Sequence, residues 1–212
     1  MPRTSRRTGS AAVNSPAASD IFRSATNRAI SKELERIDVL FHSYSDSSSG
    51  VIGPEGIESL CSDVGVEHTD IRMLIVAGGL KALRSDSIGK LKKALTELEK
   101  EVRSPENFSD FYSYAFRYCL TEDKQRSIDI ESTCELLDLI LGPIYRPQIG
   151  KLTDFLKGQS DYKVINMDQW MGFLRFCKEI NFPSVDNYDP ALAWPLILDN
   201  FVEWMQQQQH GR

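Results

Sequence analysis

The chain has 212 residues, and its 41% hydrophobic and 26% charged content is ordinary for a globular protein. No apolar run approaches the ~18 residues of a membrane span, and the N-terminus lacks the apolar core of a signal peptide, so no membrane partner is expected. The net charge is −5 although residues 1–30 carry five arginines and one acid, so the acidic excess lies in the rest of the chain. This balance argues against nucleic acid as the main partner and favours a basic protein.

Residues 1–28 are rich in Ser, Ala, Thr, Arg and Pro without periodicity, so we expect a disordered basic tail before a domain at 29–212. Apolar residues then recur at helical spacing, and no hairpin signal interrupts them. Ser31 can cap the first helix of this domain. Further helices are predicted at 57–61, 71–80, 87–102, 108–120, 130–141, 152–156 and 167–177. The expected fold class is therefore all-α.

A segment at 45–56 has the outline of an EF-hand loop, with Gly50 at the sixth position and Ile52 at the eighth. Calcium requires carboxylates at several loop positions and a bidentate glutamate at the twelfth. The first, third, fifth and twelfth positions instead hold Ser45, Ser47, Ser49 and Gly56. We therefore expect a degenerate EF-hand-like N-terminal half that holds no metal. A calcium-regulated EF-hand protein is an alternative that these residues disfavour.

Motifs of catalysis and metal binding are missing from the sequence. It has three histidines and no H-E-x-x-H, phosphate-binding glycine loop or G-x-S-x-G motif, which predicts a protein that is not an enzyme and uses no cofactor. The cysteines are far apart and form no C-x-x-C, so they indicate neither a zinc site nor disulfides. Reduced thiols point to the cytoplasm or nucleus. The four positions are Cys61, Cys119, Cys134 and Cys177.

The C-terminal run at 188–204 is the most informative part of the chain. Pro195 suits a first helical position and predicts a helix to about Gln207. The apolar residues of this helix cover a wide inner face, and its polar residues Asp199, Asn200 and Glu203 gather on the other side. Ala193 lies in the turn before it. A small residue beside an acidic helix face suits a docking surface better than a catalytic pocket.

Over roughly Glu33–Met205 the chain resembles the defective-in-cullin-neddylation (DCN1-like) family and its potentiating-neddylation, or PONY, domain. Besides the run at 188–203, the resemblance is carried by Ile52-Gly53-Pro54-Glu55-Gly56-Ile57, Ser87-Ile88-Gly89-Lys90-Leu91-Lys92, Phe108-Ser109-Asp110-Phe111-Tyr112 and Met167-Asp168-Gln169-Trp170. It implies a non-catalytic scaffold-type ligase of the neddylation pathway. Such a protein binds a cullin C-terminal winged-helix domain together with the conjugating enzyme that carries the ubiquitin-like modifier Nedd/Rub, and its gain is proximity and orientation.

The resemblance also implies two binding sites. The family's cullin-binding patch, an Asp, an Ala and an Asp, corresponds by motif to Asp168, Ala193 and Asp199. From the residues alone, the better interpretation of both aspartates is that they are solvated surface acids. The second site is an apolar pocket for the acetylated N-terminal methionine of the conjugating enzyme. Its lining would be Ile57, Met73, Val76, Ala77, Tyr118 and Leu139, each of which is also a plausible core residue.

The chain departs from the family pattern after Ala77. Gly78-Gly79-Leu80-Lys81 follows directly, where the family has a helix end, a second loop and a helix start. The missing piece would close the methionine pocket. This leaves the cullin side intact and makes a cullin-binding adaptor or competitor, without conjugating-enzyme binding, the alternative function. The sequence does not indicate which cullin is bound.

Overall fold

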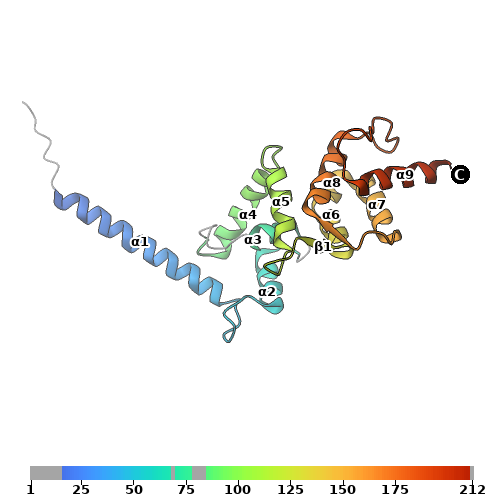
Figure 1. Cartoon of the computed structure of the whole chain (residues 1–212). Coiled ribbons are helices and arrows are strands. Elements are labelled where there is room, and N and C mark those ends of the chain that lie inside the picture. Colours follow the sequence, from blue (N-terminus) through green and yellow to red (C-terminus); the bar gives the residue numbers. More distant parts are fainter. Residues whose placement is uncertain (1–15, 68–69, 78–84, 211–212) are drawn as a thin grey trace, which may run out of the picture. The chain divides into compact units, whose positions relative to one another are not determined.

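The computed structural model describes residues 16–67, 70–77 and 85–210 (Figure 1). The chain divides into two compact units. An N-terminal unit comprises Met1–Val64 and Leu80–Lys92, and a C-terminal unit comprises Gly65–Gly79 and Lys93–Arg212. Apart from two short strands, the regular elements in the described ranges are helices, which confirms the all-α class. No helix in these ranges is both long and apolar enough to cross a membrane.

The N-terminal unit contains α1 (Pro16–His42), α2 (Pro54–Val64) and the beginning of α4 (Ile88–Val102). Helix α1 starts earlier than the expected Ser31, so residues 16–28, which were expected to be disordered, are helical. The physical reason is local, because proline fits the first helical turn and the alanines that follow favour a helix. Residues 1–15 of the predicted tail lie outside the described residues.

Polar contacts connect elements of the N-terminal unit. The Tyr44 hydroxyl donates to the Asp63 carboxylate of α2 at 2.6 Å. Asp86 forms ion pairs with Arg36 of α1 at 3.2 Å and with Lys90 of α4 at 2.8 Å. Apolar packing beneath them comes from buried residues of α1 and α2, namely Ile37, Leu60, Cys61 and Val64.

The C-terminal unit contains α3 (Ile71–Ala77), most of α4, α5 (Phe108–Tyr118), α6 (Ile130–Ile140), α7 (Gly142–Gly158), α8 (Met167–Glu179) and α9 (Leu196–His210). Its centre is a contact between α5 and α8, where the rings of Tyr112 and Trp170 stack at 4.2 Å between centroids. The Tyr112 hydroxyl donates to the Trp170 carbonyl at 3.0 Å, and the Trp170 indole donates to the Tyr112 carbonyl at 2.9 Å. These reciprocal bonds satisfy both buried polar groups and fix the register of the two helices.

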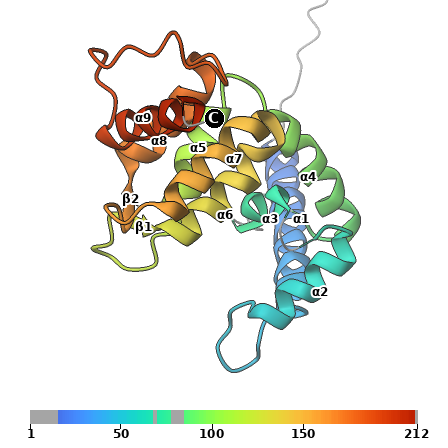
Figure 2. The same cartoon turned by 90° about the vertical axis from the view of Figure 1, so that its right-hand side faces the viewer.

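A short antiparallel ladder lies at one end of this unit (Figure 2). It pairs β1 (Ser127–Asp129) with β2 (Val164–Asn166), and its central pair, Ile128 and Ile165, is buried. Each strand leads directly into a helix. The Asp129 carboxylate accepts from the Ser132 backbone N–H at the start of α6, and Asn166 forms a capping box with Gln169 at the start of α8.

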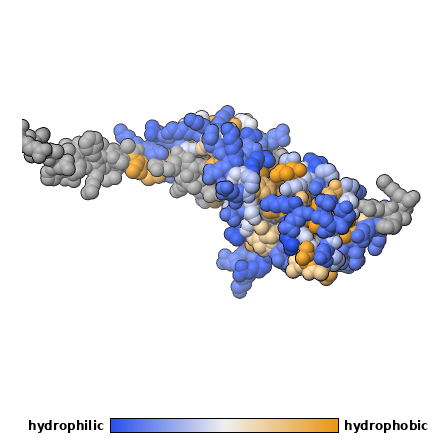
Figure 3. Space-filling view, turned by 90° about the horizontal axis from the view of Figure 1, so that it is seen from above, coloured by the Kyte–Doolittle hydropathy of each residue, from blue (hydrophilic) through white to orange (hydrophobic). Residues whose placement is uncertain are grey.

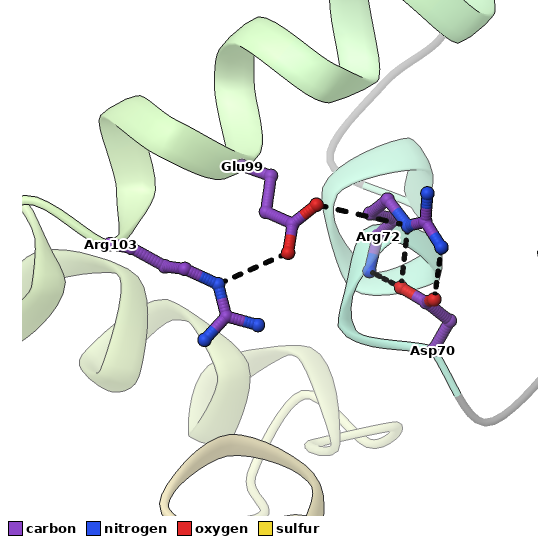
Figure 4. Close-up of polar contacts among 4 residues, drawn as sticks. All are labelled: Asp70, Arg72, Glu99 and Arg103. Carbon is purple, nitrogen blue, oxygen red and sulfur yellow. Dashed lines mark hydrogen bonds and ion pairs between the residues drawn. The ribbon is translucent and has the colours of Figure 1, made fainter. Parts of the chain in front are cut away.

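Charged side chains connect α3 to α4 within the C-terminal unit (Figure 4). The Arg72 guanidinium binds the Asp70 carboxylate, with Nη2 to Oδ2 at 2.5 Å, and approaches Glu99 at 3.9 Å. Glu99 is also paired with Arg103 one turn later, at 3.1 Å. The hydrogen bond from Arg72 lowers the pKa of Asp70. The network therefore holds the first turn of a seven-residue helix against a longer one.

Candidate functional site

The predicted docking surface is built on the crossing of α8 and α9. Gly172 lies at the crossing, where a Cβ would come within 2.8 Å of the Pro195 ring and 3.3 Å of Leu198. Only glycine permits this approach without displacement of α9. Buried apolar residues of both helices, including Phe173 and Ile197, pack on the inner side.

The three predicted cullin-binding residues lie along this crossing. Asp168 is exposed in the first turn of α8, one helical turn before Gly172. Ala193 is exposed in the segment before α9, two residues before Pro195. Asp199 is half-buried in the first turn of α9. Asp168 is thus one helical turn before Gly172, while Ala193 and Asp199 lie two residues before and one helical turn after Pro195.

The loop between α8 and α9 is held by its own side chains. Asn187 accepts from the Asn181 backbone N–H at 2.7 Å and donates to the Glu179 carbonyl at 2.8 Å, which closes the loop onto the end of α8. Val185 is buried with a φ of 49°. A β-branched residue in the left-handed region is strained, so surrounding packing must hold this conformation.

A stack of side chains that sequence reasoning did not identify supports the surface. The Arg175 guanidinium lies over the Trp194 ring at 3.9 Å, and the Trp194 ring stacks on Tyr188 at 5.4 Å between centroids. The Tyr188 hydroxyl donates to Asp199 Oδ1 at 2.6 Å. The pKa of Tyr188 is raised, first by burial and then by the hydrogen bond to Asp199 and its negative charge. The aromatic residues near Ala193 were the only hint of this stack in the sequence. Their contacts form across a loop, so they could not be predicted from the sequence.

Apolar residues surround Ala193 on the exposed side. Leu192 retains 50% of its accessible surface and Leu196 retains 67%. Figure 3 shows a face of the molecule that is mainly hydrophilic with separate hydrophobic patches, so large exposed leucines are a minority feature. These two exposed leucines lie within seven residues of Asp199 along the chain, so this segment offers both apolar area and negative charge to a partner protein.

The six residues predicted to line the methionine pocket are distributed between the two units. Ile57 is exposed on α2 of the N-terminal unit. In the C-terminal unit, Met73 is half-buried and Val76 is buried on α3, Tyr118 is exposed at the end of α5, and Leu139 is half-buried on α6. Ala77 ends α3, and its side chain lies outside the described residues. The predicted pocket therefore stays a prediction.

A cavity of about 840 Å³ is present near one of these residues. Leu139 lines it together with Cys119, Leu136 and Pro143, and Glu135 and Asp138 contribute carboxylates. It lies entirely in the C-terminal unit, between the end of α5, the outer side of α6 and the start of α7. Its lining combines apolar and acidic residues, and the Asp138 carboxylate is already paired with Arg146.

The loop that resembles an EF-hand uses its carboxylate internally. Asp46 accepts hydrogen bonds from the backbone N–H groups of Ser48 and Ser49 at 2.8 and 2.9 Å, and from the Ser48 hydroxyl. These bonds lower the pKa of Asp46 to about 2. In the part of the chain that the structure describes, no group of three or more His, Cys, Asp or Glu residues could hold a metal ion.

Known proteins similar to this chain place these features in a family. A family model described as cullin binding matches residues 90–204, which include α8, the loop after it and most of α9. DCN1-like protein 4 of Homo sapiens is 38% identical over 80% of this chain and 62% of its own length. DCN1-like protein 5 of Homo sapiens is 34% identical over 80% of this chain and 76% of its own length. The chain belongs to the DCN1-like family.

This DCN1-like chain spans only part of the length of some relatives. The matches to DCN1-like protein 4 of Homo sapiens and of Danio rerio span 62% and 65% of those relatives, which is less than two thirds of their length. Each alignment runs over 186 positions but covers 80% of this chain, which is about 170 of its 212 residues. Some aligned positions of the relatives are therefore unmatched in this chain.

Proposed function

We propose that this DCN1-like chain binds a cullin through the α8–α9 surface and promotes attachment of the ubiquitin-like modifier Nedd to it. The observation that carries the proposal is the close approach of Gly172 to Pro195, because Asp168 is one helical turn from Gly172 and Ala193 and Asp199 lie within four residues of Pro195. The matched family region covers all three. Its partner surface would be a basic part of a cullin C-terminal winged-helix domain, with apolar side chains that meet Leu192 and Leu196.

The proposed chemistry requires no nucleophile from this chain. It would hold the conjugating enzyme and the cullin so that the thioester lies near the acceptor lysine, which raises their effective concentration and fixes their orientation. The conjugating-enzyme site would use the predicted methionine-pocket residues, of which Leu139 lines the cavity in the C-terminal unit. We propose action in the cytoplasm, the nucleus or both.

A second candidate function is a cullin-binding adaptor or competitor that does not hold the conjugating enzyme. It is supported by the departure of the sequence from the family pattern directly after Ala77. Both functions share the cullin surface. They are separated by affinity for an acetylated N-terminal peptide of the conjugating enzyme.

Charge reversal at Asp199 tests the cullin surface. Asp199→Lys would place like charges together, and loss of a desolvated charge pair typically costs ~2–5 kcal/mol of binding free energy. We expect affinity for a cullin C-terminal domain, measured by calorimetry, to fall at least about thirtyfold. Asp154→Lys on α7 is the matched control, because Asp154 is exposed on another helix and its ion pair with Lys151 is long, at 3.8 Å. A folded Asp199→Lys protein with unchanged affinity would overturn the assignment.

A further inference from the structure

Asp199 is held by a chain of contacts that begins on α8. The Arg175 guanidinium lies over the Trp194 ring, and its Nη1 reaches the Ala193 carbonyl at 3.5 Å. Phe176 contacts both Trp194 and Tyr188, with centroids 6.3 and 6.2 Å away. These contacts fix the ring of Tyr188 from two sides. Because the ring is fixed, its hydroxyl has a defined position relative to α9.

The hydroxyl of Tyr188 is directed at one oxygen of Asp199. The bond to Oδ1 is 2.6 Å long, which is the short range of a hydroxyl that donates to a charged carboxylate. A carboxylate accepts through two oxygens, so an approaching ammonium or guanidinium group can bind at Oδ2 while Tyr188 holds Oδ1. A held carboxylate loses less rotamer freedom on binding than a free one.

From this geometry we infer that Tyr188 is a positioning residue of the docking surface, whose hydroxyl fixes the Asp199 carboxylate in the orientation that receives a cationic side chain of the cullin. The inference rests on the proposed function, since it assigns a role at the same surface. Tyr188 acts through Asp199 and is itself half-buried, so the hydroxyl is not the group that meets the partner. The stack of Arg175 on Trp194 holds the ring from behind.

The test is a double-mutant cycle on affinity for a cullin C-terminal domain. Tyr188→Phe keeps the ring and its stacking and removes only the hydroxyl, so we expect affinity to fall about three- to tenfold. Asp199→Asn should lower the affinity further. In the Asp199→Asn background, Tyr188→Phe should change affinity by less than about twofold, because its target charge is gone.

Tyr162→Phe is the matched control for the loss of a hydroxyl. The Tyr162 hydroxyl accepts from the side chain of Asn200, the residue after Asp199 on the same helix, at 2.9 Å. This variant should retain affinity for the cullin domain. Circular dichroism and thermal unfolding of each variant, compared with the unmodified chain, check that α9 keeps its structure.

An NMR titration with ring-labelled tyrosine gives a second readout. Asp199→Asn should lower the pKa of Tyr188, because the carboxylate that raises it is removed, and should leave unchanged the tyrosines other than Tyr162, whose pKa the Asp199 charge also raises. This shift would report the hydrogen bond and the charge effect of Asp199 on Tyr188, and the double-mutant cycle tests the role of Tyr188 in binding.

The outcomes separate the two proposals. If Asp199→Asn does not weaken binding, the assignment of the docking surface fails. If Asp199→Asn weakens binding and Tyr188→Phe does not, only the role of Tyr188 fails. If both weaken binding and their effects add fully, Tyr188 acts independently of Asp199, and the inference is also overturned.

Discussion

Asp46 organises the turn at 46–51 through hydrogen bonds of its own carboxylate. Its carboxylate accepts from two backbone N–H groups and from serine hydroxyls, so it organises the turn that the sequence predicts to hold no calcium. Asp46 falls outside the ligand positions in the expected register, because that register begins at Ser45. The loop keeps its shape through hydrogen bonds within 46–51, including Asp46 N–H to the Val51 carbonyl at 2.9 Å.

Because of these hydrogen bonds, we expect Asp46 to make the free energy of unfolding depend on pH. The pKa of Asp46 is lowered from its ordinary value of 3.8 to about 2 in the folded chain. The contribution of the Asp46 carboxylate to stability is therefore complete above the pKa of the unfolded chain, and it is lost as the pH falls through the pKa of the folded chain. Asp46→Ala should therefore be less stable than the unmodified chain at about pH 6, and roughly half of that difference should remain at pH 3. Urea unfolding at both values measures it, and a difference independent of pH would contradict the assignment.

Positions of single residues could be predicted from the sequence where they depend only on local helical geometry. The exposure of Asp168 and the position of Ala193 before the last helix follow from helix faces and from Pro195. The contact of Tyr188 with Asp199 could not be predicted, because it depends on how the loop at 180–195 returns to α9. Helical periodicity of 3.6 residues does not predict the path of that loop.

At the element scale, the α8–α9 crossing depends on one glycine. Gly172→Ala would place a Cβ 2.8 Å from the Pro195 ring, and such overpacking typically costs ~1–3 kcal/mol of stability. Because Pro195 moves with Ala193 and α9, we also expect weaker cullin binding. Thermal unfolding and calorimetry measure the two effects.

Gly150→Ala on α7 is the control for that substitution. A Cβ at Gly150 meets nothing within 4 Å, so the change removes backbone freedom without a clash. It should stabilise the chain by up to ~1 kcal/mol and leave binding unchanged. Equal effects of the two substitutions would show that the close approach at Gly172 does not hold the crossing.

Helices with clear apolar stripes were predicted well, and less regular elements were not. The expected range 87–102 agrees closely with α4, and 108–120 with α5. The expected 152–156 became α7, which begins at Gly142, because Pro147 and the non-helical Tyr145 hide the start of the helix from a periodicity argument. Strands β1 and β2 were missed, since three residues paired with a segment far along the chain give no local signal.

At the scale of the whole molecule, the departure after Ala77 decides between the two proposed functions. The N-terminal unit carries Ile57, and the C-terminal unit carries the other predicted pocket residues. A pocket for the acetylated methionine would also need a cover, and the resemblance to the family predicts that cover in the segment expected after Ala77. The all-α class could be predicted without that segment because helices such as α4 and α5 have clear apolar stripes of their own.

Restoring the missing segment from a longer relative, such as DCN1-like protein 5 of Homo sapiens, tests this point. Burying one methionine side chain contributes ~1.5–3 kcal/mol, so we expect the chain as it stands to bind an acetylated conjugating-enzyme peptide roughly ten- to a hundredfold more weakly than the restored chain. Calorimetry with acetylated and unacetylated peptides measures this. Cullin affinity should be equal in both chains, because the α8–α9 surface lies in a different part of the sequence. If both chains bind the peptide equally tightly, the segment is unnecessary, and the scaffold is favoured over the competitor. If the two chains differ in cullin affinity, the insertion disturbs the C-terminal unit itself.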